Sequence, residues 1–219
     1  MKVLGIETSG ERGGVALLED DRVLAVRRFT EGMVHGREIA PALRAMLLDL
    51  GLSPGALDLV ACDIGPGSYT GLRVGLAAAK GLAFALGKPL VGVPSLDALA
   101  EAARGRARLL CPVLDARWGQ IYGALYEDGR RTGEFRAEPP EAFAARVPPG
   151  ALVFGDALET YGELFRHRSQ APRELWDPRP ETIALLGGRL HRQGLCGDPA
   201  ALVPLYLRPT EAELKRNQT

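Results

Sequence analysis

The sequence predicts a duplicated α/β protein in which each half is a mixed β-sheet covered by helices. Strands and helices alternate after an initial β-rich meander, and segments of the second half match segments of the first in the same order. The Arg-rich stretch around Gly105 marks the expected boundary. It divides the 219 residues into halves 1–104 and 105–219, with the last residues allowed to pack back on the first half.

The first half begins with three β-rich runs, at 2–7, 14–19 and 22–29. Turn residues separate these runs, which predicts an antiparallel meander. A helix is expected over 34–50, because apolar residues there recur at helical spacing. The apolar stripe of this helix consists of Ile39, Leu43, Met46, Leu47 and Leu50.

Alternating strands and helices follow the meander. The continuous apolar run LDLVACDI at 57–64 is typical of a buried central strand. A second helix is expected over 70–86, ending at Gly87, because glycine favours the C-terminal cap. LVGV at 90–93 predicts another strand, and Ser95 is the expected N-cap of the helix after it.

The second half repeats this pattern. GVALLEDDR at 14–22 is matched by YGALYEDGR at 122–130, and LVACD at 59–63 is matched by LVFGD at 152–156. Shared strand composition accounts for some of this similarity, but the shared order of elements favours a duplication. Two such halves are expected to face each other across a cleft.

Composition excludes several functional classes. Lys plus Arg equals Asp plus Glu, at 27 each, which disfavours autonomous nucleic-acid binding because that requires an excess of positive charge. The three cysteines are far apart and form no CxxC pair, as expected for reduced thiols. No signal-peptide core or apolar stretch of about 20 residues is present, so we expect a cytoplasmic protein without a membrane span.

The loop GPGSYTGLRVG at 65–75 resembles a phosphate cradle. Its glycines are spaced GxGxxxG, however, which matches neither the dinucleotide nor the P-loop fingerprint. Either Ser68 or Thr70 is expected to cap the following helix. Along that helix a small residue recurs at every fourth position, which predicts close approach of another element, from the same chain or from a partner. These small residues are Gly71, Gly75, Ala79 and Ala83.

The turn IETSGERGG at 6–14 is the other candidate for anion binding, since backbone N–H groups of such a turn can hold phosphate. An ordinary exposed hairpin has the same composition. The corresponding turn of the second half, LDARWGQIY, carries Arg117 and the bulky Trp118 where small residues are wanted. Four carboxylates follow strands and could converge on the cleft, or could simply cap the turns. They are Glu7, Asp63, Asp115 and Asp156.

Metal and nucleophilic chemistry have little support in the sequence. His35 and Glu38 could offer two ligands from one helical face, but a metal site needs a third. The other histidines, His167 and His191, form no cluster with them. No GxSxG motif is present, and Ser68 has no evident histidine partner. We therefore expect neither a metal site nor catalytic residues.

Five segments in order resemble the TsaB (YeaZ) family over essentially the whole chain. They are LGIETS, VHGREIAPAL, GPGSYTGLRVG, the strand after Gly87-Lys88-Pro89, and PLYLRPTEAE, of which GPGSYTGLR is the most specific. The resemblance implies the actin/sugar-kinase/Hsp70-like, or ribonuclease H-like, fold. It also implies a bacterial protein needed to make threonylcarbamoyladenosine beside the anticodon of transfer RNA.

In that family the transferase is the paralogue TsaD, which TsaB binds and activates, and the ATPase TsaE joins them. TsaD-like relatives carry a His-x-x-x-His metal pair on the first helix, whereas here His35 is followed by Ile39. The resemblance therefore implies a non-catalytic scaffold, and it argues against a peptidase for the same reason. It further implies a homodimer of the isolated chain, contact with transfer RNA only through the complex, and no required cofactor.

The family docks its partner through two helices of the first half, which correspond to 34–50 and 70–86. The expected interface residues are His35, Glu38, Ala42, Gly71, Arg73, Val74, Gly75, Ala78, Ala79 and Leu82. Candidate residues for weak binding of ATP, ADP or another anion, at the cleft or at the partner interface, are Glu7, Thr8, Ser9, Gly67 and Ser68. The alternatives are a small phosphotransferase or ATPase that uses the cleft, and an RNA-binding module.

Overall fold

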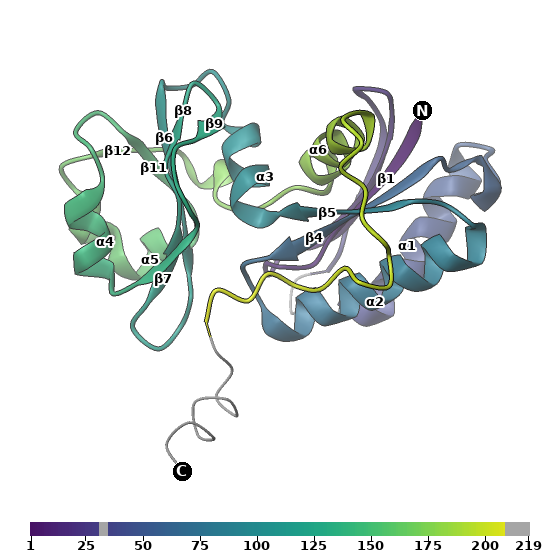
Figure 1. Ribbon diagram of the computed structural model, residues 1–219, viewed down its shortest axis with the longest axis horizontal. Coiled ribbons are helices and arrows are strands. Elements are labelled where there is room, and N and C mark those ends of the chain that lie inside the picture. The colour runs from purple at the N-terminus through teal and green to yellow at the C-terminus, as the bar shows by residue number, and fades with distance from the viewer. Residues whose placement is uncertain (31–34, 209–219) are drawn as a thin grey trace, which may run out of the picture.

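The computed structural model describes residues 1–30 and 35–208, which form two lobes side by side (Figure 1). Each lobe is built on one β-sheet, and the chain passes between the lobes through α3 (Ser95–Ala102) and returns before α6 (Pro180–Arg192). Both sheets carry helices, so the predicted α/β class is confirmed. No helix in the described ranges is long and apolar enough to cross a bilayer.

The first lobe contains a five-stranded sheet in the order β3-β2-β1-β4-β5. Strands β1 to β3 form the predicted antiparallel meander, while β4 and β5 run parallel to β1. The apolar run predicted as a central strand is β4, which lies between β1 and β5. The bounds are β1 Lys2–Glu7, β2 Gly14–Glu19, β3 Arg22–Arg28, β4 Leu59–Gly65 and β5 Leu90–Pro94.

Helices cover both faces of this sheet. On one face lie α1 (His35–Asp49) and α2 (Tyr69–Leu86), side by side, with a short 3-10 turn η1 (Pro54–Ala56) after α1. On the other face lies α6, which comes from the second half of the sequence and packs on β1, β2 and β4. Side chains alternate between the two faces of the sheet along each strand. Leu4 and Ile6 therefore pack against α1 and α2, while Val3 packs against α6.

The second lobe repeats the strand order of the first, as β10-β7-β6-β11-β12. In each lobe the first strand, β1 or β6, pairs antiparallel with the second, β2 or β7, and parallel with a later strand, β4 or β11, so the predicted duplication is confirmed at the level of topology. The strands are β6 Leu109–Asp115, β7 Ile121–Gly123, β8 Tyr126–Glu127, β9 Arg130–Arg131, β10 Arg136–Glu138, β11 Leu152–Phe154 and β12 Ser169–Gln170. The helical segments are α4 Pro140–Arg146, α5 Ala157–Tyr161, η2 Gly162–Phe165 and η3 Arg173–Leu175.

Two serines are expected N-caps of helices, and the structure confirms one of them. Ser68 is the N-cap of α2, where its Oγ accepts a hydrogen bond from Gly71 N at 3.2 Å, as predicted. Ser95 is not the cap of α3, so that prediction is wrong. Its hydroxyl instead donates to Asp63 Oδ1 at 2.7 Å, because the side chain is buried against β4.

The small-residue face of α2 packs against its own chain. A Cβ on Gly71 would overlap the carbonyl oxygen of Thr8, and a Cβ on Gly75 would overlap the hydroxyl of Thr8. Ala79 and Ala83, farther along the same face, are buried in the core below. The helix therefore rests directly on the turn that follows β1, and only glycine permits this approach.

The C-terminal segment 198–208 runs along α2 and reaches the second lobe (Figure 1). Lys80 Nζ donates to Ala200 O at 2.9 Å, and Leu205 N donates to Ile64 O at 2.7 Å. Arg208 Nη1 donates to Ala116 O at 3.1 Å. This segment thus joins α2, the end of β4 and the second lobe.

Two alanine substitutions within α2 separate packing from helix propensity. Gly71→Ala should lower the free energy of unfolding by about 1–3 kcal/mol, because the new methyl group meets backbone that must move. Gly81→Ala should raise it by about 0.5–1 kcal/mol, because nothing lies within 4 Å of that position. Chemical denaturation measures both, and a Gly71→Ala variant as stable as Gly81→Ala would contradict the packing described here.

Candidate functional site

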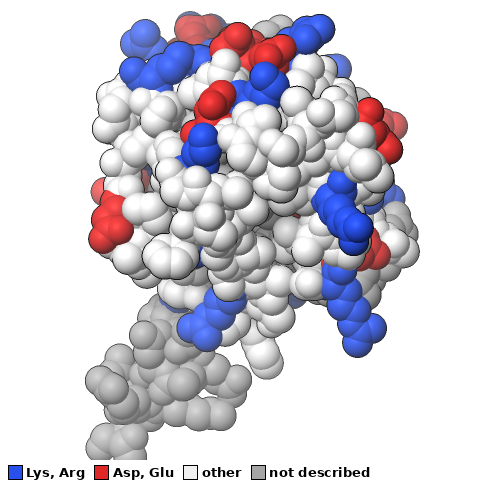
Figure 2. Space-filling model, turned by 90° about the vertical axis from the view of Figure 1, so that its right-hand side faces the viewer, with Lys and Arg blue, Asp and Glu red and all other residues white. Residues whose placement is uncertain are grey.

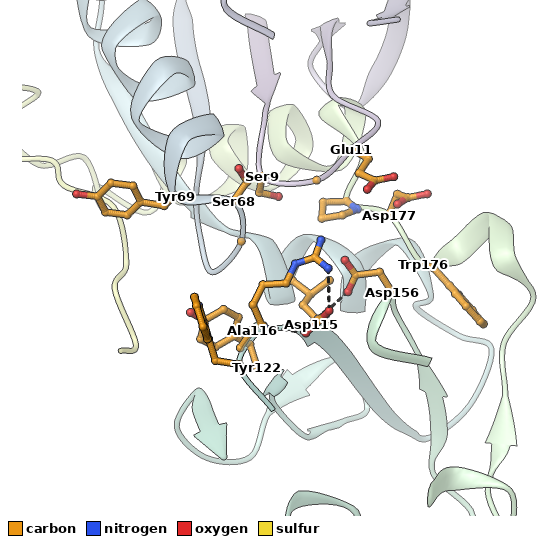
Figure 3. Close-up of a pocket in the computed structure, with 16 residues that line it drawn as sticks. Ser9, Glu11, Ser68, Tyr69, Asp115, Ala116, Tyr122, Asp156, Trp176 and Asp177 are labelled. Atoms are coloured by element: carbon orange, nitrogen blue, oxygen red, sulfur yellow. Dashed lines mark hydrogen bonds and ion pairs between the residues drawn. The ribbon is translucent and has the colours of Figure 1, made fainter. Parts of the chain in front are cut away.

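A cleft of about 370 Å³ lies between the two lobes. Figure 3 shows Ser9 and Ser68 on the first-lobe side, opposite Asp115 and Asp156 on the second-lobe side. The predicted cleft is therefore present, and the two turns that follow β1 and β6 form parts of its walls. Its complete lining is Ser9, Gly10, Glu11, Gly67, Ser68, Tyr69, Leu114, Asp115, Ala116, Arg117, Trp118, Tyr122, Asp156, Trp176, Asp177 and Pro178.

The turn after β1 is capped by its own carboxylate. Glu7 Oε1 accepts hydrogen bonds from Ser9 N at 2.6 Å, from Ser9 Oγ at 2.7 Å and from Gly10 N at 3.3 Å. These backbone N–H groups are the ones that a phosphate in the cleft would use. Because Glu7 already occupies them, the turn presents no free N–H pair at these positions.

The turn after β6 is capped in the same way. Asp115 Oδ1 accepts from Arg117 N at 2.8 Å, and Asp115 Oδ2 accepts from the Arg117 guanidinium at 3.1 Å. Arg117 and Trp118 have φ angles of 59° and 55°, in the left-handed region that favours glycine. The Trp118 side chain is 85% exposed. Arg117 and Trp118, the bulky residues noted in the sequence, thus adopt a backbone conformation at the cleft that is strained for residues other than glycine.

The four strand-end carboxylates separate into two pairs. Asp115 and Asp156 line the cleft, and Asp156 Oδ1 accepts from Asp115 N at 2.8 Å. Glu7 and Asp63 are fully buried beneath the first-lobe wall and do not line it. All four accept hydrogen bonds from nearby backbone N–H groups, so turn capping accounts for their position at strand ends.

Burial shifts the proton affinity of three of these groups. Burial, together with the neighbouring Asp63, raises the pKa of Glu7 to about 8. Burial also raises the pKa of Asp63 to about 6, against the hydrogen bonds from Ser95 and Gly65 that lower it. The pKa of Asp156 is likewise raised to about 6, mainly by burial.

The side chains of the cleft offer little catalytic chemistry. The Ser9 hydroxyl donates to Glu7, and the Ser68 hydroxyl accepts from the helix that it caps. His35 Nε2 lies 2.9 Å from Gly10 O, and Glu38 accepts from Thr30 N at 2.7 Å, so these two side chains do not face a common open site. Within residues 1–30 and 35–208, no group of three or more His, Cys, Asp or Glu side chains could hold a metal ion.

Only some of the candidate anion-binding residues line the cleft. Ser9, Gly67 and Ser68 line the cleft as expected. Glu7 and Thr8 are fully buried and do not line the cleft, and weak anion binding at these two residues stays a prediction. The sequence reasoning missed the remaining lining from the second lobe, including Tyr122, Trp176 and Asp177, because no motif marks those positions.

The expected interface residues lie mostly on the inner side of α1 and α2. His35, Gly71, Gly75 and Ala79 are buried within the chain itself, so the structure does not place them at an exposed surface, and their role at an interface stays a prediction. Five others are half-buried, and all of them except Glu38 pack against the core, namely Glu38, Ala42, Val74, Ala78 and Leu82. Arg73 alone among the ten is exposed.

The opposite side of the same helices carries exposed apolar side chains that the sequence reasoning missed. Leu48 of α1 is 76% exposed, and Phe84 of α2 is 91% exposed. Small exposed residues accompany them on both helices. The outer-face residues, as we define them, are Ala40, Pro41, Arg44, Ala45 and Leu48 of α1 and Arg73, Ala77, Gly81, Phe84 and Ala85 of α2.

Charged side chains are unevenly distributed over the first lobe. Figure 2 looks onto the end of the molecule where this lobe lies, and charged groups gather along the upper edge of that view. The central area below them is largely uncharged. This end of the first lobe thus has a mostly uncharged central area, with groups of both signs above it and Lys and Arg side chains at the lower right.

Comparisons with known proteins give a consistent result. The family model described as TsaD, tRNA N6-adenosine threonylcarbamoyltransferase, matches residues 32–145. The chain is 32% identical to the tRNA threonylcarbamoyladenosine biosynthesis protein TsaB of Bacillus subtilis, over 98% of the chain and 97% of that protein. It is 34% identical to TsaB of Escherichia coli, over 65% of the chain and 62% of that protein.

Solved structures agree with this. YeaZ from Pseudomonas aeruginosa matches with a TM-score of 0.82 and 28% identity, covering 94% of this chain and 99% of that one. The ethanolamine utilization protein EutJ of Carboxydothermus hydrogenoformans matches with a TM-score of 0.56 and 15% identity, covering 85% of this chain and 90% of that one. The latter likeness concerns the fold alone, and both are consistent with the actin-like fold.

Two substitutions at the second turn test its backbone strain. Trp118→Gly should be more stable than Trp118→Val by about 1–2 kcal/mol, because a left-handed residue costs about that much unless it is glycine, and a β-branched side chain is least suited to it. Thermal or chemical unfolding of the two variants measures the difference. Equal stability would show that the turn relaxes out of this conformation.

Proposed function

Because the chain belongs to the TsaB (YeaZ) family of tRNA threonylcarbamoyladenosine biosynthesis proteins, we propose that it is the non-catalytic partner of a TsaD transferase. In this role the chain binds TsaD through the outer faces of α1 and α2 and stabilises the active form of the transferase. The reaction itself takes place in TsaD.

The observation that carries this proposal is the pair of exposed apolar side chains on adjacent helices. Leu48 and Phe84 are large, apolar and almost entirely accessible to solvent. Such side chains on a helix pair are typical of a surface that another protein covers. The surrounding small residues, including Ala77 and Gly81, leave room for the backbone of a partner helix to approach.

The chemistry of the cleft supports a non-catalytic role. Glu7 and Asp115 cap the two turns that would otherwise bind phosphate, and the hydroxyls of Ser9 and Ser68 each take part in a hydrogen bond. At the position of the second metal-binding histidine of TsaD-like relatives stands Ile39, which is buried in the core. A metal-dependent transfer reaction therefore lacks its ligands in the part of the chain that the structure describes.

The proposed complex has several components, each with its own contact. The chain forms a heterodimer with TsaD, TsaE joins as a third component, and transfer RNA is contacted through the complex. In the absence of TsaD, the same apolar outer faces pair with those of a second copy, which gives a homodimer. No cofactor is required, and ATP or ADP binds weakly at the cleft or at the TsaD interface.

A small phosphotransferase or ATPase is the alternative function. The observation in its favour is the cleft of about 370 Å³ between two duplicated lobes. An assay of ATP hydrolysis and phosphate transfer by the purified protein distinguishes the two functions. The proposal predicts no activity above the level of a buffer control. Turnover that is lost in Ser9→Ala and Asp115→Asn variants, which alter the cleft turns, would favour the enzyme.

Substitutions on the outer faces test the docking surface. Leu48→Asp and Phe84→Asp should each weaken binding to TsaD by about 30-fold or more, because burying an unpaired carboxylate at an interface hot spot costs about 2 kcal/mol or more. Isothermal titration calorimetry with purified TsaD measures the affinity. Leu195→Asp is the matched control, since Leu195 is 60% exposed and lies after α6, away from both helices.

The control variant should bind TsaD like the unmodified chain. All three variants should also show the circular dichroism and melting temperature of the unmodified chain, because each changes an exposed position. If Leu48→Asp and Phe84→Asp fold normally and bind TsaD with unchanged affinity, the outer faces of α1 and α2 are not the docking surface.

A further inference from the structure

We propose that Glu7 and Asp63 bind a single proton between them, and that this shared proton holds the turn on which α2 rests. Neither residue lines the cleft, and the proposed function uses neither. Both are fully buried carboxyl groups in the middle of the first lobe. Two such groups without a compensating charge require a physical explanation.

The sheet register places the two carboxyl groups next to each other. Strands β1 and β4 are parallel neighbours, and Ile6 pairs with Cys62, so the following residues Glu7 and Asp63 are adjacent. Ile6 and Cys62 face α1 and α2, and side chains alternate along a strand. Glu7 and Asp63 therefore point together to the other face of the sheet, towards α3 and α6.

Each carboxyl group has one satisfied oxygen and one without a partner. Glu7 Oε1 accepts three hydrogen bonds from the turn, and Asp63 Oδ1 accepts from Gly65 N at 2.6 Å and from Ser95 Oγ at 2.7 Å. Glu7 Oε2 and Asp63 Oδ2 are buried and have no hydrogen-bond partner among the described residues. A proton on one of these oxygens, donated to the other, satisfies both.

The charged groups on the surrounding elements are engaged elsewhere. On α6, Glu181 pairs with Arg28 of β3, and Arg189 pairs with Glu101. On α3, Asp97 accepts from the Tyr126 hydroxyl at 2.6 Å. Of the other described groups nearby, the Arg179 guanidinium before α6 donates to Glu174 O, His35 of α1 contacts Gly10 O, and Lys2 and Glu19 pair at the far end of the meander.

Neither carboxyl group has an ion-pair partner in the described part of the chain. Two adjacent buried carboxylates would repel each other and would both lack hydration. In agreement with the geometry, burial raises the pKa of each group, and Asp63 raises that of Glu7 further. One proton removes the repulsion and leaves one negative charge, which the five described N–H and O–H contacts stabilise only in part.

The shared proton stabilises the turn after β1, against which α2 packs. Glu7 caps the turn, Thr8 lies beneath Gly71 and Gly75 of α2, and Ser68 N donates to Ser9 O at 2.8 Å. Loss of the proton would drive the two carboxylates apart and loosen this turn. Because α2 also carries part of the proposed docking surface, TsaD binding would weaken at the same pH; this last step alone rests on the proposed function.

The direction of the pH dependence follows from the raised pKa of Glu7. An unfolded glutamate ionises near 4.5, whereas in the fold the group keeps its proton until about pH 8. The contribution of the neutral group to stability is complete below pH 4.5 and is lost as the pH rises to about 8. Between about pH 6, below which Asp63 also holds a proton, and about pH 8, the unfolding equilibrium constant should increase by about tenfold for each unit rise in pH.

Amide variants reproduce the protonated state. In Glu7→Gln the amide oxygen accepts from the turn while the amide NH₂ donates to Asp63 Oδ2, and Asp63→Asn does the converse. Both variants should lose the tenfold-per-unit dependence measured by urea denaturation between pH 6 and pH 8.5, and should exceed the unmodified chain in stability at the upper end. Glu11→Gln, an exposed acid on the same loop, is the matched control and should keep the dependence.

Infrared spectroscopy of the unmodified chain gives a readout that does not depend on how the variants fold. At pH 7 we expect the C=O band of one protonated carboxyl group, which should be absent from both Glu7→Gln and Asp63→Asn. If the band is lost in Glu7→Gln but remains in Asp63→Asn, the proposal of a shared proton is wrong, because Glu7 then carries its proton independently of Asp63.

Three further results would also overturn the proposal. One is the absence of a protonated carboxyl band at pH 7. Another is a pH dependence of Glu7→Gln equal to that of Glu11→Gln. The third is a loss of stability when sodium and potassium are replaced by tetramethylammonium at constant ionic strength, because a metal cation would then occupy the place assigned to the proton.

Discussion

The contact between α2 and the turn after β1 is the constraint on which the rest of the first lobe depends. Gly71 and Gly75 lie against the backbone and side chain of Thr8 so closely that a Cβ at either position would overlap them. This contact fixes α2 on the sheet, and α2 in turn supports α1 and the C-terminal segment along its flank. It also decides which side of α2 is buried and which side remains for a partner.

The same turn shows how the carboxylates of this chain occupy N–H groups at the cleft. In the cleft the N–H groups of Ser9 and Gly10 point to the Glu7 carboxylate, and on the opposite wall Arg117 N points to Asp115. The fold keeps its two lobes and its interlobe cleft, but each turn binds its own carboxylate. The docking surface proposed above is the outer surface of α1 and α2, where Leu48 and Phe84 are exposed.

The fold was largely predictable from the sequence, whereas the functional surface was not. Repeated segments and apolar runs identified the duplicated sheets, the central strand β4 and both helices within a residue or so, because these features follow from local periodicity. The spacing of Gly71, Gly75 and Ala79 correctly predicted close packing, but periodicity alone cannot say whether a small-residue face meets its own core or a partner. Likewise, the buried position of Glu7 depends on the pairing of β1 with β4, which no local pattern encodes.

Hydrogen–deuterium exchange with and without TsaD tests the central claim most directly, because it reports on every segment in one experiment. The account predicts that TsaD binding slows amide exchange along α1 and α2 and leaves the cleft turns at residues 7–10 and 115–119 unchanged. Slower exchange at the two cleft turns, with no change along α1 and α2, would contradict it.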